Sequence, residues 1–313
     1  MSAAQGIGVG EQQQLEDDQH DSGSSAPTQP GRRRATPYLL LLPGMAWLTI
    51  FFILPIATLL STSTQTRPEG AEIGVYTQTF RVANYTDTLS EYATVFARSF
   101  TYALIATVLA LAISYPLAYA IAFKVGRWRN LLLVLVVAPF FVSFLLRTVA
   151  WKQILADEGW VADALRTLHV LSPDGRIINT APAVVIGITY NFLPFMILPI
   201  YASLERVDPR LMEAAGDLYA NALTTMRKVT FPLSLPGVVA GTLLTFIPAA
   251  GDYVNSALLG DPVHTTMVGN VIDSRFLKVV DYPTAAVLSV SLMVSILVLV
   301  GLYIRRAGTE ELV

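Results

Sequence analysis

The sequence contains no cysteine, and this absence removes several kinds of chemistry. Disulfides, thiolate metal sites and cysteine nucleophiles are excluded. The chain also lacks any Gly-Lys pair, so it has no phosphate-binding loop of the type G-x-x-x-x-G-K-[ST]. Its three histidines form no metal-binding spacing, and it has no G-x-S-x-G nucleophile elbow. We therefore expect no enzyme activity and no metal site in this chain.

Charged residues are scarce as well. They make up 14% of the chain while 53% of residues are hydrophobic, whereas a soluble domain has about 25% charged residues. The composition predicts an all-α membrane protein, because a spanning helix needs roughly 20 mostly apolar residues. Six stretches meet that requirement: 38–60, 99–123, 131–150, 181–204, 237–258 and 283–304. The net charge of −2 and the scattered basic residues give no indication of a nucleic-acid partner.

The first 36 residues differ in kind from the rest, because they contain almost no large apolar side chain. They are predicted to form a disordered tail. They do not resemble a signal peptide, because the apolar run begins only after residue 37 and has no small-residue cleavage site. The predicted organisation is a tail at 1–36, a transmembrane domain at 37–304 and a short tail at 305–313.

The basic residues predict the orientation, since lysine and arginine prefer cytoplasmic loops. With the N-terminus inside, 12 of the 21 basic residues lie in cytoplasmic segments and 9 face outward. The turn KVGRWRN at 124–130 carries three of the 12. Both termini and the segment 205–236 are therefore expected on the cytoplasmic side.

The segment 205–236 is polar and helix-prone, although it lies between two apolar stretches. Asp208 and Pro209 are typical of a helix start. One apolar stripe is expected at three- and four-residue steps, at Leu211, Ala215, Leu218, Ala222 and Met226. Glu213, Asp217, Asn221 and Thr224 recur in the same way and predict a polar face. The pattern fits one long helix or two short ones, and it also fits a linker that rests on the membrane surface.

A family resemblance favours a more specific interpretation. The letters EAA at 213–215 are followed, four residues after the second alanine, by Tyr219 and later by VTFP at 229–232. This pattern resembles the EAA motif of binding-protein-dependent ABC transporter permeases, which has glycine at the position of Tyr219. Tyrosine adopts a positive φ only at a cost, so the sequence leaves open whether the chain turns here.

The resemblance implies a type I ABC importer permease fold, with this loop as the coupling helix that docks on a cytoplasmic ATPase subunit. Glu213 would supply a charged contact with that subunit. The residues expected to couple to the ATPase are Glu213, Ala214, Ala215, Asp217, Tyr219 and Pro232.

Longer segments point to the cargo. LLRTVAWKQILADEGWVADAL at 145–165 and PFMILPIYASLERVD at 194–208 resemble spermidine/putrescine permeases, particularly their B-type subunit. The resemblance implies a bacterial cytoplasmic-membrane protein that works with a second permease subunit, two ATPase subunits and an extracytoplasmic solute-binding protein. It implies no cofactor in this chain, with ATP and Mg²⁺ bound by the ATPase subunits.

The chemistry of a polycation suggests which residues line its path. Carboxylates and aromatic faces suit amines, and a lone acid within a membrane segment is costly unless it lines a cavity or finds a partner. We therefore expect Asp252 and Tyr253 on the substrate path, with Tyr190 facing the same cavity. The alternative for Asp252 is that its carboxylate satisfies backbone groups freed where Pro248 and Gly251 break the helix.

Two alternatives remain for the function. Related permeases carry other small organic solutes, such as an aminophosphonate, a quaternary amine or a sugar. A stand-alone secondary transporter or a membrane sensor is the other alternative, although the predicted spans contain few of the ionisable residues that ion-driven transport usually needs.

Overall fold

A computed structural model describes residues 36–307 of the chain, so the predicted tail at 1–36 falls almost wholly outside the described residues, as do residues 308–313. Residues up to Ile56 form one compact unit and residues from Ala57 onward form another. The first unit contains α2 (Thr36–Leu48), the π-helical turn η1 (Thr49–Ile53) and the beginning of α3 (Leu54–Ser63). Residues 41–63 together are long and apolar enough to cross a membrane.

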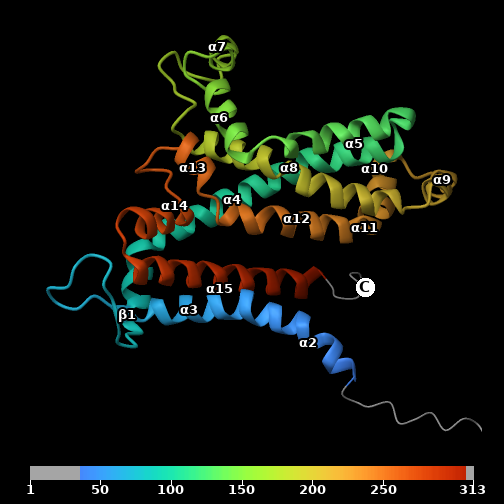
Figure 1. The fold of residues 1–313 in the computed structure, drawn as a ribbon. Helices are drawn as coiled ribbons and strands as arrows, with labels where there is room; N and C mark the ends of the chain where they lie inside the picture. The colour runs from blue at the N-terminus through green and yellow to red at the C-terminus, as the bar shows by residue number, and fades with distance from the viewer. Residues whose placement is uncertain (1–35, 308–313) are drawn as a thin grey trace, which may run out of the picture. The chain divides into compact units, whose positions relative to one another are not determined.

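The second unit is a helical bundle built on α4 (Ala83–Phe123), α8 (Ala181–Glu205) and α12 (Leu235–Ala250). These three helices lie side by side, and α15 (Tyr282–Ala307) packs beside them (Figure 1). Ala103 and Ala110 of α4 and Ile188 and Ile200 of α8 are fully buried in this core. The predicted all-α membrane fold is confirmed.

Small residues allow α12 to approach α8 closely. A Cβ atom at Gly237 would lie 2.5 Å from the carbonyl oxygen of Pro199, and one at Gly241 would lie 2.9 Å from the sulfur of Met196. The two glycines are four residues apart and so face the same side of α12, an arrangement common between membrane helices. A larger side chain at either position would separate the two helices.

One of the predicted spans is bent, and another, 237–258, is broken after Ala250. Residues 126–141, made of η2 (Gly126–Trp128), α5 (Arg129–Val137) and η3 (Ala138–Phe141), meet α6 (Phe144–Ile154) at 97°. The stretch 131–150 is therefore not one continuous helix, because Val142 and Ser143 adopt extended backbone angles. Residues 36–307 contain four helices long and apolar enough to span a membrane, or as many as six when each bent pair counts as one span.

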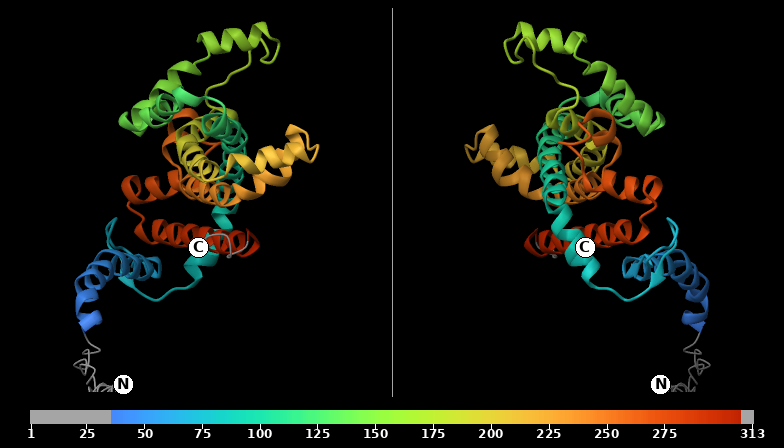
Figure 2. Two further views of the ribbon diagram at one scale, coloured as in Figure 1. Left: turned by 90° about the vertical axis from the view of Figure 1, so that its right-hand side faces the viewer. Right: turned by 90° about the vertical axis from the view of Figure 1, so that its left-hand side faces the viewer.

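The two ends of the second unit carry different connections (Figure 1). The β1 end holds the short antiparallel pair β1 (Gln65–Thr66) and β2 (Thr77–Gln78), together with α13 (Val254–Leu259), α14 (Val268–Asp273) and the π-helical η5 (Ser274–Lys278). The α9 end holds α9 (Pro209–Asp217), α10 (Ala222–Thr225), the π-helical η4 (Met226–Thr230) and α11 (Phe231–Leu233). Helix α7 (Trp160–Thr167) follows α6 and projects from the bundle in a different direction from α9 (Figure 2).

Candidate functional site

Helix α9 begins where the sequence predicts. The side chain of Asp208 accepts a hydrogen bond from the backbone N–H of Arg210 at 2.9 Å, and Pro209 occupies the first helical turn. This cap satisfies one of the free N–H groups at the helix start. Just before it, Arg129 forms an ion pair with Glu205, and its guanidinium lies 5.1 Å from the ring centroid of Tyr201. These contacts fix the position at which the segment leaves α8.

Helix α9 ends in a Schellman motif with tyrosine at its left-handed position. The N–H of Tyr219 donates to the carbonyl oxygen of Gly216 at 2.9 Å, and the N–H of Ala220 donates to that of Ala215 at 3.0 Å. Tyr219 has φ of +59°. Glycine is the preferred residue at this position of the motif because it has no Cβ.

The geometry at Tyr219 answers the question that the sequence left open. The chain turns at this residue and forms two short helices, α9 and α10, rather than one long helix. A left-handed conformation costs an ordinary residue about 1–2 kcal/mol. The turn therefore forms despite the tyrosine, because other interactions of the fold offset this cost.

The second helix of the pair leads directly into α12. Asn221 caps α10 by accepting from the N–H of Thr224 at 2.8 Å. The chain then passes through η4 and α11, where Pro232 is exposed, and meets α12 at Ser234 with a bend of 67°. Ser234 is fully buried, and its hydroxyl lies 2.9 Å from that of Tyr115 on α4 and 3.0 Å from the carbonyl oxygen of Phe231.

The apolar side chains of this segment are exposed. Leu218 is 81% exposed, Tyr219 is 99% exposed and Leu223 is 77% exposed. The single stripe expected from Leu211 to Met226 does not form as a continuous line, because the turn at Tyr219 separates its two halves. Instead, large apolar side chains gather within residues 218–223.

The residues of the EAA motif and Asp217 also have no side-chain hydrogen bond or ion pair among the described residues. Glu213, Ala214 and Asp217 are exposed, and Ala215 is partly so. Within residues 36–307, no hydrogen bond or ion pair joins residues 209–225 to anything beyond 208–230. The segment is held at its two ends and leaves its middle available to another molecule.

Asp252 lies in the break between α12 and α13, and hydrogen bonds surround its carboxylate. It is 5% exposed, and its two oxygens accept from the backbone N–H and the side-chain amide of Asn255, each at 2.9 Å. The side chain of Asn255 in turn accepts from that of Asn191 on α8 at 2.9 Å. Asn191 also donates to the hydroxyl of Thr148 on α6 at 3.1 Å. A buried polar network thus joins the break to two other helices.

None of the cavities described for residues 36–307 is lined by all three residues expected on the substrate path. Tyr190 lies on the wall of an apolar cavity of about 270 Å³ with Leu117 and Ile197, and its ring is 5.1 Å from that of Trp151. Tyr253 is 49% exposed, and neither it nor Asp252 lines that cavity. The contacts of Asp252 agree with the backbone-satisfying alternative, and its role on the path stays a prediction.

Sequence reasoning did not identify the amides in this network. Asn191 and Asn255 carry no charge, so a search for ionisable residues within the spans passes over them. The available signal was a polar amide inside the apolar run of residues 181–204, because such side chains usually face a neighbouring helix. Arg147 is also buried at 9% exposed, with its guanidinium 5.5 and 5.7 Å from the ring centroids of Phe140 and Phe144.

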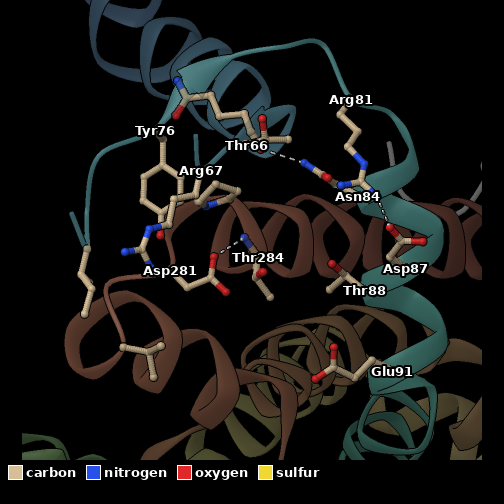
Figure 3. Close-up of a pocket in the computed structure, with 14 residues that line it drawn as sticks. Thr66, Arg67, Tyr76, Arg81, Asn84, Asp87, Thr88, Glu91, Asp281 and Thr284 are labelled. Atoms are coloured by element: carbon tan, nitrogen blue, oxygen red, sulfur yellow. Dashed lines mark hydrogen bonds and ion pairs between the residues drawn. The ribbon is translucent and has the colours of Figure 1, made fainter. Parts of the chain in front are cut away.

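The β1 end contains a cavity of about 530 Å³ lined by charged side chains from several elements (Figure 3). Arg81 and Asp87 form an ion pair at 3.0 Å on one side of it, and Asp281 accepts from the N–H of Thr284. Beside the cavity, Arg275 contacts Asp281 at 3.5 Å and donates to the hydroxyl of Tyr92. This hydrogen bond to Tyr92 raises the pKa of Arg275. The contacts join α4 to the segment before α15.

Comparison with known proteins identifies relatives over most of the chain. The family of binding-protein-dependent transport system inner membrane components matches residues 114–307. The spermidine/putrescine transport system permease protein PotB of Escherichia coli (strain K12) is 36% identical over 86% of this chain and 96% of its own length. PotB of Haemophilus influenzae is 38% identical over 83% of this chain and 90% of its own length.

Solved structures show the same fold. The crystal structure of a bacterial ABC transporter that imports the acidic polysaccharide alginate contains a chain with a TM-score of 0.67. The match covers 87% of this chain and 94% of that one, at 17% identity. A second alginate transporter structure, in complex with a periplasmic protein bound to an alginate pentasaccharide, gives 0.63 over 85% of this chain and 92% of that one, at 18% identity. At these identities the likeness concerns the fold alone.

Proposed function

The chain belongs to the family of binding-protein-dependent transport system inner membrane components, and on that premise we propose that it carries spermidine and putrescine across the membrane. As a member of this family it is a multi-pass inner-membrane permease subunit of an ABC importer, and it is a transport subunit rather than an enzyme. The observation that carries the cargo is its 36–38% identity to permeases named for spermidine and putrescine, over most of both chains.

The proposed assembly follows from what this chain contains and what it lacks. It has no phosphate-binding loop, and in the proposed assembly ATP and Mg²⁺ bind to two partner ATPase subunits. A second permease subunit completes the translocation path, and an extracytoplasmic binding protein delivers the polyamine to the outer face. Both termini and the α9 end face the cytoplasm in this proposal, and the distribution of basic residues supports that orientation.

The coupling role is assigned to α9 and α10. Their exposed residues, including Glu213 and Asp217, contact the ATPase subunit, and the direct passage into α12 links that contact to the bundle. Closure of the ATPase dimer around ATP then moves the segment, and the permease alternates between inward- and outward-facing states. Asp252, Tyr253 and Tyr190 are proposed to line the path, where a carboxylate and aromatic faces suit a polyamine.

Uptake of labelled spermidine tests both parts of the proposal. Cells lacking the gene are complemented with wild type or with Glu213→Ala, and membrane levels of the chain are measured alongside. We expect wild type to restore uptake and the variant to restore little of it at equal membrane levels, because the variant lacks the charged contact with the ATPase. If spermidine uptake does not depend on the gene, the polyamine assignment is wrong, and the ligand of the binding protein identifies the cargo.

A further inference from the structure

Tyr219 combines two properties that are each unfavourable in the isolated chain. Its backbone is left-handed, with φ of +59°, and its side chain is 99% exposed. Glycine at this position would relieve the backbone and would expose no aromatic ring. At this exposure, nothing in the described chain packs against the ring. Burial of the ring therefore requires a contact outside residues 36–307.

The surroundings of Tyr219 have the composition of a protein interface. Leu218 and Leu223, at 81% and 77% exposed, lie within five residues of it in the chain, and we refer to residues 218, 219 and 223 as the apolar patch. Glu213 and Asp217 precede Leu218 by five residues and by one residue, and both are exposed and unpaired among the described residues. An aromatic residue in an apolar centre with a charged rim is typical of interfaces.

We propose that the apolar patch, with the ring of Tyr219 at its centre, inserts into an apolar pocket of the ATPase subunit and is the main anchor of the coupling loop. This inference rests on the proposed function, since it names the part of the loop that the ATPase holds. The acids at 213 and 217 predict basic side chains at the rim of that pocket. The left-handed turn matters because it separates α9 from α10 and places the ring outside both helices.

The energetic reasoning favours an anchor over a passive spacer. Aromatic residues bury a large apolar area and have few rotatable bonds to fix, so they are common among the residues that dominate binding. A spacer would need only the turn, which glycine would provide at lower cost. A tyrosine at this position is understandable when its ring becomes buried in the assembled transporter.

Absence of cysteine from the chain makes a direct test possible. Single-cysteine variants Tyr219→Cys and Leu223→Cys are labelled with a maleimide in inside-out vesicles, with and without the ATPase subunit of the same transport system co-expressed. Arg306→Cys, at the exposed end of α15, serves as a control expected on the same side of the membrane. We expect the ATPase subunit to slow labelling at 219 and 223 and not at 306. Equal labelling with and without it would overturn the proposal, and so would protection in its absence, which would indicate burial in the lipid surface.

A second measurement uses variants that separate the ring from the backbone. The amount of ATPase subunit that copurifies with the permease, and its rate of ATP hydrolysis, are measured for Tyr219→Phe, Tyr219→Ala and Tyr219→Gly. We expect Phe to behave like wild type and Ala and Gly to weaken ATPase binding by about tenfold or more, as for other central interface residues. His169→Gly is the matched control, since it removes an exposed ring from a left-handed residue at a different loop.

The outcomes separate this inference from the function on which it rests. If wild type binds the ATPase subunit and Tyr219→Gly binds it equally well, the anchor is wrong while the permease role stands. If wild type binds no ATPase subunit, the proposed coupling role fails and the anchor fails with it. Full binding by Tyr219→Phe together with weak binding by Tyr219→Ala supports the anchor, because these two variants keep the Cβ atom and differ only in the ring.

Discussion

Helices α7 and α9 end in the same way but are held very differently. Both close with a Schellman motif that has a left-handed residue other than glycine, His169 with φ of +57° and Tyr219 with φ of +59°. In each, the next N–H reaches back to the last turn, from Val170 to Leu165 and from Ala220 to Ala215, both at 3.0 Å. The local backbone is therefore nearly identical in the two loops.

The difference lies in their attachment to the rest of the chain. Within α7, Arg166 donates to the carbonyl oxygens of Asp157 at 2.9 Å and Gly175 at 3.3 Å, and Ala162 is fully buried. Helix α9 has no buried residue. One loop is thus held by its own chain, whereas the other is proposed to be completed by the ATPase subunit. The same turn is thus attached to the surrounding chain after α7 and exposed to solvent after α9.

The largest expected effect is in amide hydrogen exchange. In the permease without its ATPase subunit, amides at 209–225 should exchange faster than those at 160–171, because exposed segments with few tertiary contacts open at low free energy. Adding the ATPase subunit should slow exchange at 209–225 by about tenfold or more, since binding stabilises the closed form. Equal slowing in both segments would contradict the comparison.

A matched pair of arginine substitutions probes the attachment of the two loops. Arg166→Ala should lower the free energy of unfolding by about 1–2 kcal/mol, because it removes hydrogen bonds from a charged donor to two carbonyls. Arg210→Ala should change it by less than about 0.5 kcal/mol, because that side chain is exposed and unpaired among the described residues. Thermal unfolding of the purified full chain in detergent gives both values. A larger loss for Arg210→Ala would show that α9 is held by contacts other than those described.

The smallest effect is expected from glycine at the two left-handed positions. His169→Gly and Tyr219→Gly should each raise the free energy of unfolding by about 0.5–1 kcal/mol, since relief of the backbone exceeds the added entropy of the unfolded chain. Similar thermal shifts for the two variants, with transport lost only at 219, would sharpen the comparison. A destabilisation at 219 in the permease alone would mean that the ring already packs within the chain.

Sequence reasoning located the membrane segments and the start of α9 because both depend on local patterns. Apolar runs define the spans, and Asp208 with Pro209 marked the start of α9 correctly. The turn at Tyr219 was not predictable from propensity, because tyrosine disfavours the conformation that the surrounding hydrogen bonds impose. The contact of Arg275 with Tyr92 was equally inaccessible, since 183 residues separate the two and no local pattern marks either.

The joint at Ser234 has a mechanical consequence. A flexible joint between α11 and α12 would not transmit movement of the preceding segment. At this joint, however, Ser234 is buried and hydrogen-bonded to Tyr115 of α4. The 67° bend between residues 222–233 and 235–250 is therefore held by a contact inside the protein. In the proposed coupling mechanism, movement of α10 and α11 is therefore passed to α12 and, through the contact between Ser234 and Tyr115, also to α4.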